Sequence, residues 1–568
     1  MLCTGIIIKK GLEQAIDTHQ GDAVRASDLL VRCLENEGVQ FIFGVPGEEN
    51  LDVMDSLLGS SIRFITTRHE QGAAFMADVY GRLSGRAGVC LSTLGPGATN
   101  LITGVADANL DHAPLVAISG QVSLDRQYME SHQFIDLVAL FKPVTKWNSE
   151  ILLPQMIPEA VRKAFKVAQT EKPGAIHMVL PEDVAAKQVS EKDALTPLGV
   201  QAPFIPEPTA GQVKRAIAVL QEAKRPIILA GNGVARRHAE EAVRRCARTL
   251  HIPVVHTFMG KGIMPDSDAL SLYAVGLPIR DYASRVMEEA DVVIAVGYDF
   301  VEYAPCFWNP NRDKQVIHVD VLPAEVDAHY HVAVGVLGDV AQSLARITDG
   351  VIPFDAEWSG RARQTVFSGL EEEHAAQPKW PLRPQHIIRE LRTVLSPDDI
   401  VICDVGAHKL WMARMFPCHA PNTCIISNGF ASMGIGLPGA VAAQLLFPSR
   451  RVVAVTGDGG FLMNSQEMET VVRLQLPVVI LIWRDDGYGV IRWKQMMQFG
   501  RTSSVEFGNP DFVAYARAYG ALGFRVEGAS ELMPILKEAL KSGRPAIIDC
   551  PVDYEENMRL AEHLTHRS

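Results

Sequence analysis

The sequence predicts an α/β protein made of three doubly wound domains, each built on a parallel sheet. Short apolar runs typical of buried strands alternate with helix-like stretches along most of the chain, and this alternation favours parallel sheets covered by helices on both faces. The runs form three clusters, and 568 residues provide enough chain for three or four domains. We therefore expect domains at residues 24–186, 209–350 and 385–555.

The strand-like runs are short and rich in Val, Ile and Leu. In the first domain they lie at 41–43, 64–66, 89–91, 115–118 and 176–180. In the second domain they lie at 226–229, 253–255, 292–296 and 316–319, and in the third at 400–402, 452–455, 478–482 and 546–548. Two polar, proline-bearing stretches, 187–208 and 352–384, separate the clusters and are predicted to be linkers.

Charge and composition exclude several classes of protein. The 54 basic residues are outnumbered by 66 acidic ones, and no basic block is long enough to neutralise a run of phosphates, so we expect no nucleic-acid partner. The longest apolar runs, such as 477–483, fall far short of the roughly 18 residues that cross a bilayer. We therefore expect no membrane segment. Residues 1 to about 22 lack a secretory pattern and are expected to form a loose extension.

The nine cysteines are scattered along the chain and form no Cys-x-x-Cys pair. This pattern suggests neither a disulfide framework nor a zinc site. Thiols without such pairing fit a reducing compartment, so we expect a cytoplasmic protein.

The most specific motif is Gly457-Asp458-Gly459-Gly460, which follows a predicted strand and precedes a helix-like stretch at 465–472. Glycines allow the backbone to approach an anion, and a helix N-terminus offers free N–H groups. The next strand ends at Asp485, 27 residues after Asp458. Both carboxylates would then lie at the carboxyl ends of neighbouring parallel strands and face one crevice, where they suit Mg²⁺ completed by phosphate oxygens.

These residues resemble the signature of the thiamine diphosphate (ThDP) enzymes, in which Gly-Asp-Gly is followed at similar spacing by Asn or Asp. The resemblance implies that Asp458, Asp485 and the backbone carbonyl of Gly487 bind Mg²⁺. It also implies that Gly457, Gly459, Gly460 and Tyr488 contact the cofactor. Asp485 departs from the more common Asn and adds a charge to the site.

A second part of the resemblance lies at 67–78, where Glu70 falls in the first turn of a predicted helix. A glutamate there can be explained by the helix dipole alone. In ThDP enzymes the matching glutamate hydrogen-bonds N1′ of the aminopyrimidine, and the cofactor's own 4′-imine then removes the C2 proton. The resemblance implies this catalytic role for Glu70.

Two loops complete the resemblance. In Ser427–Pro438 a Met between glycines could simply pack in the core, but in the family a large apolar residue here bends ThDP. The resemblance therefore implies that Met433 acts in catalysis and that Gly429 and Met433 hold the pyrimidine. The loop 404–408 matches the diphosphate side, which implies cofactor contacts for Val405, Gly406 and His408, although Ala407 stands where many relatives carry Gln.

Over residues 26–554 the chain resembles the acetolactate synthases, and within them the catabolic branch that lacks FAD. Stretches at 94–104, 132–133, 143–146, 297–309 and 505–512 carry this likeness. The resemblance implies ThDP and Mg²⁺ as cofactors and no FAD. It also implies a transferase that decarboxylates pyruvate and joins the two-carbon unit to a second pyruvate, giving 2-acetolactate and CO₂. Whether the product serves branched-chain amino acid or acetoin formation stays open.

The resemblance assigns two substrate contacts. Gln133 would be the polar group beside the reacting substrate, although an exposed loop amide would look the same in sequence. Lys494 occupies a position where relatives carry Gln or Trp and influence the acceptor 2-oxo acid. In the family the matching glutamate and aspartate meet between two subunits, so the resemblance implies a homodimer or homotetramer.

The same residues leave other functions open. Another ThDP 2-oxoacid decarboxylase, or a carboligase with a different acceptor, is the nearest alternative. Many such decarboxylases use a His-His pair, and the chain contains none, which favours carboligation. A dinucleotide-binding protein is suggested only by Gly231-Asn232-Gly233, without an acidic partner at a convincing distance. An inactive assembly subunit would be expected to lack Glu70 or one of the two aspartates.

Overall fold

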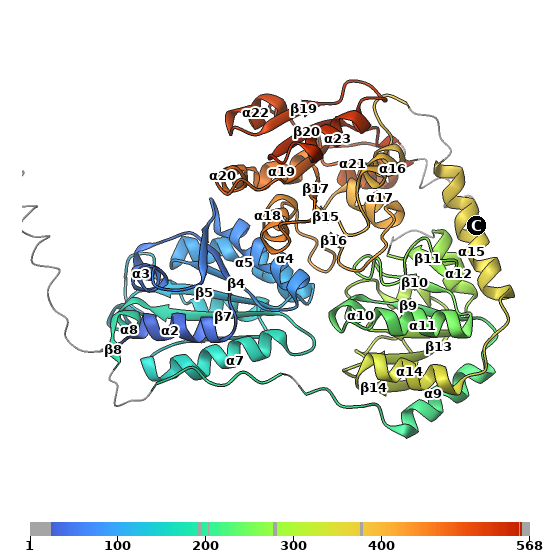
Figure 1. Cartoon of the computed structure of the whole chain (residues 1–568), viewed down its shortest axis with the longest axis horizontal. Helices are drawn as coiled ribbons and strands as arrows, with labels where there is room; N and C mark the ends of the chain where they lie inside the picture. Colours follow the sequence, from blue (N-terminus) through green and yellow to red (C-terminus); the bar gives the residue numbers. More distant parts are fainter. Residues whose placement is uncertain are drawn as a thin grey trace, which may run out of the picture.

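Three parallel sheets of six strands each form the protein, and the predicted fold class is confirmed. Figure 1 shows the three units, with the first in blue to cyan, the central one in green to yellow and the third in orange to red. The computed structural model describes residues 24–189, 195–202, 204–276, 281–374, 379–555 and 557–558. The predicted N-terminal extension lies outside the described residues. Within the described chain no helix combines the length and apolar character that crossing a bilayer requires.

The first sheet has the order β3-β2-β4-β5-β7-β6. Its strands are β2 (Phe41–Gly44), β3 (Arg63–Thr66), β4 (Gly88–Ser92), β5 (Leu115–Gln121), β6 (Trp147–Glu150) and β7 (Ala175–Pro181). The helices are α2 (Ala26–Asn36), α3 (Leu51–Leu57), α4 (Glu70–Ser84), α5 (Gly95–Leu110), α6 (Leu137–Phe141), α7 (Ile157–Gln169) and α8 (Glu182–Ala186). A short antiparallel pair, β1 (Val24–Arg25) with β8 (Gln188–Val189), joins the ends of this unit.

Alternate strand residues of the first sheet point to opposite layers of helices. Phe43 and Cys90 belong to the apolar cluster that contains α4 and α5, whereas Ile42 and Val89 belong to the cluster that contains α2 and α7. Because successive side chains of a strand alternate between faces, both faces are buried and the sheet is doubly wound.

The central sheet has the order β11-β10-β9-β12-β13-β14. Its strands are β9 (Pro226–Ala230), β10 (Val254–His256), β11 (Ser271–Ala274), β12 (Val292–Val296), β13 (Gln315–Asp320) and β14 (Val332–Leu337). The helices are α9 (Ala210–Glu222), α10 (Asn232–Arg236), α11 (Glu240–Leu250), α12 (Tyr282–Glu289), α13 (Pro305–Trp308), α14 (Val340–Gly350) and α15 (Glu357–His374).

The third sheet has the order β16-β15-β17-β18-β20-β19. Its strands are β15 (Ile400–Cys403), β16 (Cys424–Ile426), β17 (Val452–Gly457), β18 (Val479–Arg484), β19 (Leu522–Arg525) and β20 (Ala546–Pro551). The helices are α16 (Pro384–Val394), α17 (Ala407–Met415), α18 (Gly436–Leu446), α19 (Asp458–Met463), α20 (Met468–Arg473), α21 (Gly489–Phe499), α22 (Phe512–Ala518) and α23 (Leu532–Lys541).

The strands that the apolar runs did not predict all lie at sheet edges. In the six-stranded sheets they are β6, β11, β14, β16 and β19, and the short pair β1 and β8 was not predicted either. An edge strand has a neighbour on one side only and is partly exposed, so it does not need a continuous apolar run. The sequence Trp147-Asn148-Ser149-Glu150 of β6, half-buried throughout, illustrates this. The apolar-run criterion therefore finds the central strands of each six-stranded sheet and the edge strand β3, and it misses the other five edge strands.

The prediction of a linker at 352–384 is wrong for most of that stretch, because it contains the 18-residue helix α15. Trp358, Ala362, Val366 and Leu370 recur every four residues and are buried in the apolar cluster of the central and third sheets. The indole Nε1 of Trp358 donates to the carbonyl of Pro226 at 2.9 Å. This helical periodicity is present in the sequence but is obscured by the surrounding polar residues. The domain boundaries stay predictions.

The first and third units pack through one continuous apolar layer. Helix α4 lies against α18, and the cluster that fills this junction combines residues from both sheets. A Cβ on Gly439 of α18 would come within 2.9 Å of a Val79 methyl on α4. The close approach of the two helices therefore depends on a residue without a side chain.

Candidate functional site

A cavity of about 410 Å³ opens at the carboxyl ends of β15, β17 and β18. Polar loops follow these three strands, and in a doubly wound sheet such loops form the ligand crevice. The wall contains most of the residues predicted from sequence, namely Val405, Gly406, His408, Met433, Gly457, Asp458, Gly459, Gly460, Asp485, Gly487, Tyr488 and Lys494.

Asp458 is a buried and firmly oriented carboxylate. It begins α19 directly after β17, and the backbone N–H of Gly459 donates to its Oδ1 at 2.9 Å. Its Oδ2 accepts from the backbone N–H of Asp486 and from Nδ2 of Asn509, both at 2.8 Å. Because these donors come from two separate loops, the carboxylate cannot rotate without breaking several bonds. Asn509 is absent from the residues predicted from sequence, and no motif would have found it.

Asp485 lies beside Asp458, after the neighbouring strand β18. Burial and the charge of Asp458 raise the pKa of Asp485 to about 7, and burial also raises the pKa of Asp458. The Arg492 guanidinium, 3.3 Å from Asp485 Oδ2, opposes this shift only in part. Two carboxylates that repel each other in a buried crevice are the donor set that a divalent cation relieves. The residues present therefore fit Mg²⁺.

The described residues contain no group of three or more His, Cys, Asp or Glu side chains able to hold a metal ion. The predicted site uses two carboxylates and one backbone carbonyl, which leaves the other positions to phosphate and water. Such a sparse protein contribution is characteristic of Mg²⁺ that binds together with a phosphorylated ligand.

Glycines and one imidazole also line the cavity. A Cβ on Gly406 would lie 2.8 Å from the His408 ring, and one on Gly489 would lie 2.7 Å from Asp485 Oδ2. Burial lowers the pKa of His408 to about 3, so the ring is neutral at pH 7. Its buried Nε2 has no hydrogen-bond partner among the described residues. An unpaired buried polar atom beside a glycine cradle fits a bound diphosphate.

The loop between β16 and α18 brings Met433 to the cavity wall but does not bring Gly429 there. The Met433 side chain is half-buried on the wall. The N–H of Gly429 instead donates to Oδ1 of Asp111, and a Cβ at this position would lie 2.6 Å from the same oxygen. In the structure Gly429 is thus part of a domain junction rather than of the cavity wall.

Glu70 and Gln133 do not reach the cavity within one chain, since its lining comes entirely from described residues at or beyond Phe258. Glu70 begins α4, is 8 % exposed, and accepts from Nδ2 of Asn100 at 2.9 Å. Gln133 is an exposed loop residue with φ of 56°. Both belong to the first domain.

The central sheet offers a poor site for a flavin dinucleotide. At the start of α10 the carboxylate of Glu302 accepts from the backbone N–H of Asn232 at 3.0 and 3.1 Å, and from the hydroxyl of Thr257. Burial and the nearby Asp299 raise the pKa of Glu302 to about 8. An acidic side chain therefore occupies the position that a dinucleotide's phosphates take after the first strand of such a sheet. This arrangement disfavours a dinucleotide phosphate at the turn between β9 and α10.

Comparison with protein families matches three successive parts of the chain. Residues 24–140 match the description "Thiamine pyrophosphate enzyme, N-terminal TPP binding domain", where thiamine pyrophosphate is another name for ThDP. Residues 213–347 match the central domain and residues 404–550 match the C-terminal TPP binding domain of the same enzymes.

Curated proteins resemble the chain over nearly its whole length. The acetolactate synthase of Bacillus subtilis is 37% identical over 94% of this chain and 95% of its own. The catabolic acetolactate synthase of Raoultella terrigena is 37% identical over 96% of this chain and 98% of its own. The acetolactate synthase large subunit of Corynebacterium glutamicum is 34% identical over 92% of this chain and 85% of its own.

Proposed function

Because this chain belongs to the thiamine pyrophosphate enzymes, as a carboligase close to acetolactate synthase, we propose that it converts two molecules of pyruvate to 2-acetolactate and CO₂ with Mg²⁺. The observation that carries this proposal is the pair Asp458 and Asp485 on the wall of a glycine-lined cavity.

The described residues suggest a division of roles at the site. ThDP, when bound, supplies a nucleophilic carbon that attacks a 2-oxo acid and accepts the electron pair released on loss of CO₂. Asp458, Asp485 and the Gly487 carbonyl would hold Mg²⁺ against the diphosphate. The neutral ring of His408 would line the diphosphate side of the cavity without adding charge there. Met433 would press on the cofactor and keep water from the reacting carbon.

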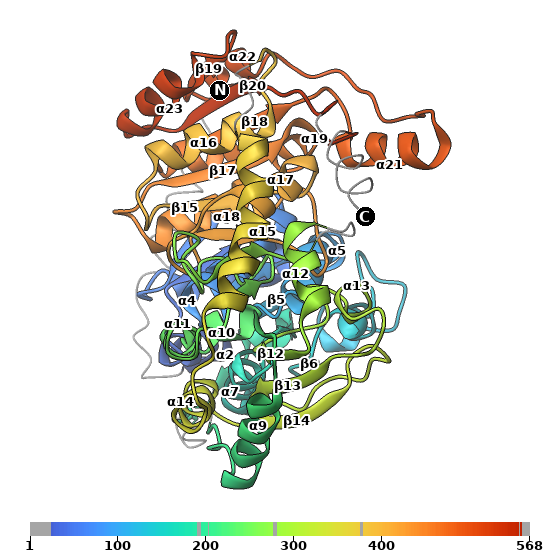
Figure 2. The same cartoon turned by 90° about the vertical axis from the view of Figure 1, so that its right-hand side faces the viewer.

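Glu70 does not line the cavity of its own chain, which supports a site shared by two chains. The first turns of helix α21 line the cavity, and the helix projects from the third domain, as Figure 2 shows. It exposes large apolar side chains, with Ile491 47% and Phe499 62% exposed. Exposed apolar surface of this kind favours burial against another subunit. Glu70 of a second copy would complete each site in a homodimer, or in a tetramer of two such dimers.

The main test is a product assay with pyruvate, ThDP and Mg²⁺. We expect pyruvate consumption together with 2-acetolactate, detected as acetoin after acid treatment, and no reaction when ThDP or Mg²⁺ is left out. Acetaldehyde as the only product would instead support a simple decarboxylase. The same preparation should carry no flavin absorbance, and a yellow protein would contradict the absence of FAD inferred from Glu302.

Gln133 and Lys494 remain proposed substrate contacts. Lys494 is an exposed cation on the cavity wall, where it can attract the carboxylate of an acceptor 2-oxo acid. We expect Lys494→Gln to raise the KM for pyruvate several-fold and to change the choice between pyruvate and 2-oxobutyrate offered together. Lys541→Gln in α23, far along the chain, is the charge-matched control. Unchanged KM and product ratio would remove Lys494 from the substrate site.

Cytoplasmic location also remains a proposal, supported by the thiols. The eight described cysteines are all free, and seven of them are buried. Free buried thiols are typical of proteins that work in a reducing compartment.

A further inference from the structure

The loop 427–433, which carries Met433 to the cavity wall, is held by side chains from another domain. Ala431 within it has a φ of 57°, and Gly434 directly after it has a φ of 93°. A non-glycine residue in this left-handed region costs free energy and persists only when the surroundings impose it. The surroundings of this loop therefore decide where Met433 lies.

Two aspartates at the C-terminal end of α5 supply most of that support. Asp107 Oδ1 accepts from the hydroxyl of Ser427 at 2.8 Å and from the backbone N–H of Ser432 at 3.3 Å. Asp111 accepts from the backbone N–H of Asn428 at 3.0 Å through Oδ2, and from that of Gly429 through Oδ1. Three main-chain N–H groups of the loop are thus bound by carboxylates of the first domain.

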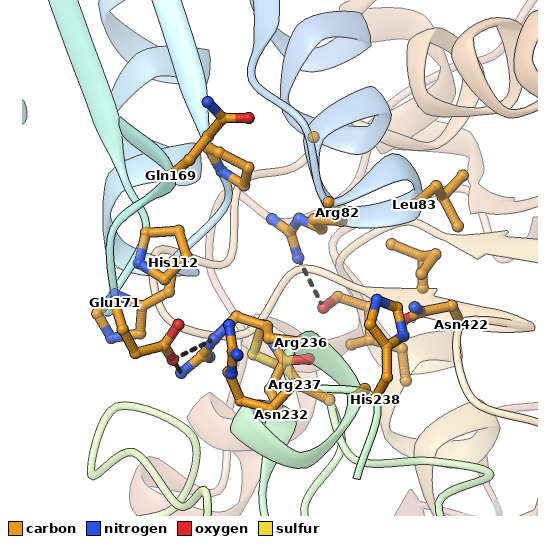
Figure 3. A pocket seen from close by; sticks show the side chains of 18 of the residues that line it. Arg82, Leu83, His112, Gln169, Glu171, Asn232, Arg236, Arg237, His238 and Asn422 are labelled. Carbon is orange, nitrogen blue, oxygen red and sulfur yellow. Dashed lines mark hydrogen bonds and ion pairs between the residues drawn. The ribbon is translucent and has the colours of Figure 1, made fainter. Parts of the chain in front are cut away.

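Arg82 of α4 holds the two aspartates in place. Its Nη2 lies 2.9 Å from Asp107 Oδ2 and 2.6 Å from Asp111 Oδ2, and its Nε lies 2.7 Å from Asp78 Oδ1. The three carboxylates are fully buried and the Arg82 side chain is 6% exposed. Nη1 of Arg82 also donates to the carbonyl of Ile426 at 3.3 Å, at the start of the loop, and Figure 3 shows this contact.

Opposite charges are buried together in this cluster. One guanidinium faces three carboxylates, and burial together with the charge of Asp111 raises the pKa of Asp107. Burial lowers the pKa of Lys409 of α17, an effect that the charges of Asp111 and Asp107 oppose only in part, and this side chain also lines the cavity. Removing one member of such a buried network leaves the others without a partner, which is strongly unfavourable.

The central domain contacts the loop on the side away from Asp111. Nδ2 of Asn428 donates to the carbonyl of Glu302 at 2.8 Å. A Cβ on Gly429 would lie 2.6 Å from Asp111 Oδ1 and 2.6 Å from a Val301 methyl. The loop therefore packs between the C-terminal end of α5 and the central-domain segment 301–302.

We propose that Asp107 and Asp111, fixed by Arg82, are positioning residues that set the Met433 loop for cofactor binding. This inference rests on the proposed function, in that the cavity binds ThDP. The first domain then has two roles. It carries Glu70, and through Asp107 and Asp111 it also supports the Met433 loop in the cavity wall of its own chain.

The test is Asp111→Asn, measured by titrating the cofactor-free protein with ThDP at fixed Mg²⁺ and following tryptophan fluorescence. An amide has a single acceptor oxygen, so the variant loses one of the two loop contacts and one of the three charges that face Arg82. We expect the ThDP dissociation constant to rise at least tenfold, and kcat to fall as well. The titration requires no turnover, so it remains informative even if the protein forms no acetolactate.

Glu37→Gln is the matched control. It breaks the ion pair of Glu37 with Arg162, whose side chains are 2% and 15% exposed, in the same domain but away from the loop. A purely structural role for Asp111 predicts that both variants lower the melting temperature and leave ThDP binding unchanged, and that result would overturn the proposal.

If Asp111→Asn does not fold, Ser427→Ala removes only the hydroxyl bond to Asp107 and should weaken ThDP binding about threefold. Unchanged binding in Ser427→Ala would then count against the proposal.

Discussion

Glu70→Gln should lower kcat by about 10³-fold, because general acid–base groups contribute roughly 10² to 10⁴ to enzymatic rates. An amide cannot share a proton with the cofactor's ring nitrogen as a carboxylic acid does. The change should be structurally mild, since the amide oxygen can still accept the Asn100 hydrogen bond, which the structure gives as 2.9 Å. We expect an unchanged melting temperature and near-normal ThDP affinity alongside the loss of acetolactate formation.

Glu159→Gln provides the control for this prediction. Glu159 is likewise the acidic residue in the first turn of a helix, α7, and is exposed on the same domain. If Glu70 served only the helix dipole, the two variants would behave alike. Wild-type turnover in Glu70→Gln would show that Glu70 does not activate the cofactor.

Asp458→Asn should abolish Mg²⁺-dependent ThDP binding at working concentrations. Even residues that only support a metal ligand change metal affinity by about 10- to 100-fold, so loss of a charged ligand should exceed about 100-fold. The aspartate also orders the site through bonds to Asp486 and Asn509, which the amide can keep only in part. Titration with ThDP at several Mg²⁺ concentrations, followed by fluorescence, measures the effect.

Asp486→Asn is the control for the metal site. Asp486 is next to Asp485, but its side chain is 52% exposed and its φ of 53° suits asparagine. This variant loses the same charge and should retain ThDP binding within a few-fold. Equal losses in Asp458→Asn and Asp486→Asn would indicate a general electrostatic effect and would contradict a metal-ligand role.

Mixing the two inactive variants tests the shared site. If Glu70 of one chain serves Asp458 of another, a mixed dimer of Glu70→Gln and Asp458→Asn contains one site with both residues intact. Co-expression should then restore up to about half the wild-type activity in the mixed dimers. If both residues served the same chain, neither site would be intact and no activity would return.

The pattern of apolar runs in the sequence was sufficient to find the central strands of every six-stranded sheet, and strand order was sufficient to place Asp458 and Asp485 in the candidate site. Central strands of parallel sheets are buried on both faces, so each leaves a continuous apolar run such as residues 479–483. Asp458 and Asp485 follow two neighbouring strands, and strand order along the chain therefore placed them at the same crevice. The glycines around them could be interpreted locally, because close backbone approach requires glycine wherever it occurs.

The tertiary structure alone decided which groups support that crevice. Asp111 and Gly429 are 318 residues apart, and Asn509 reaches Asp458 from 51 residues away. Such contacts are single side chains meeting across domain or loop junctions, so they produce no periodic pattern in the sequence. The same reason explains why Gly429 was expected at the cofactor but lies at the domain junction. It also explains why Glu70 does not line the cavity of its own chain, since that depends on how whole domains pack. Sequence by itself determined the fold class and the aspartate pair, because both follow from strand burial and strand order; the support of the Met433 loop follows only from long-range packing.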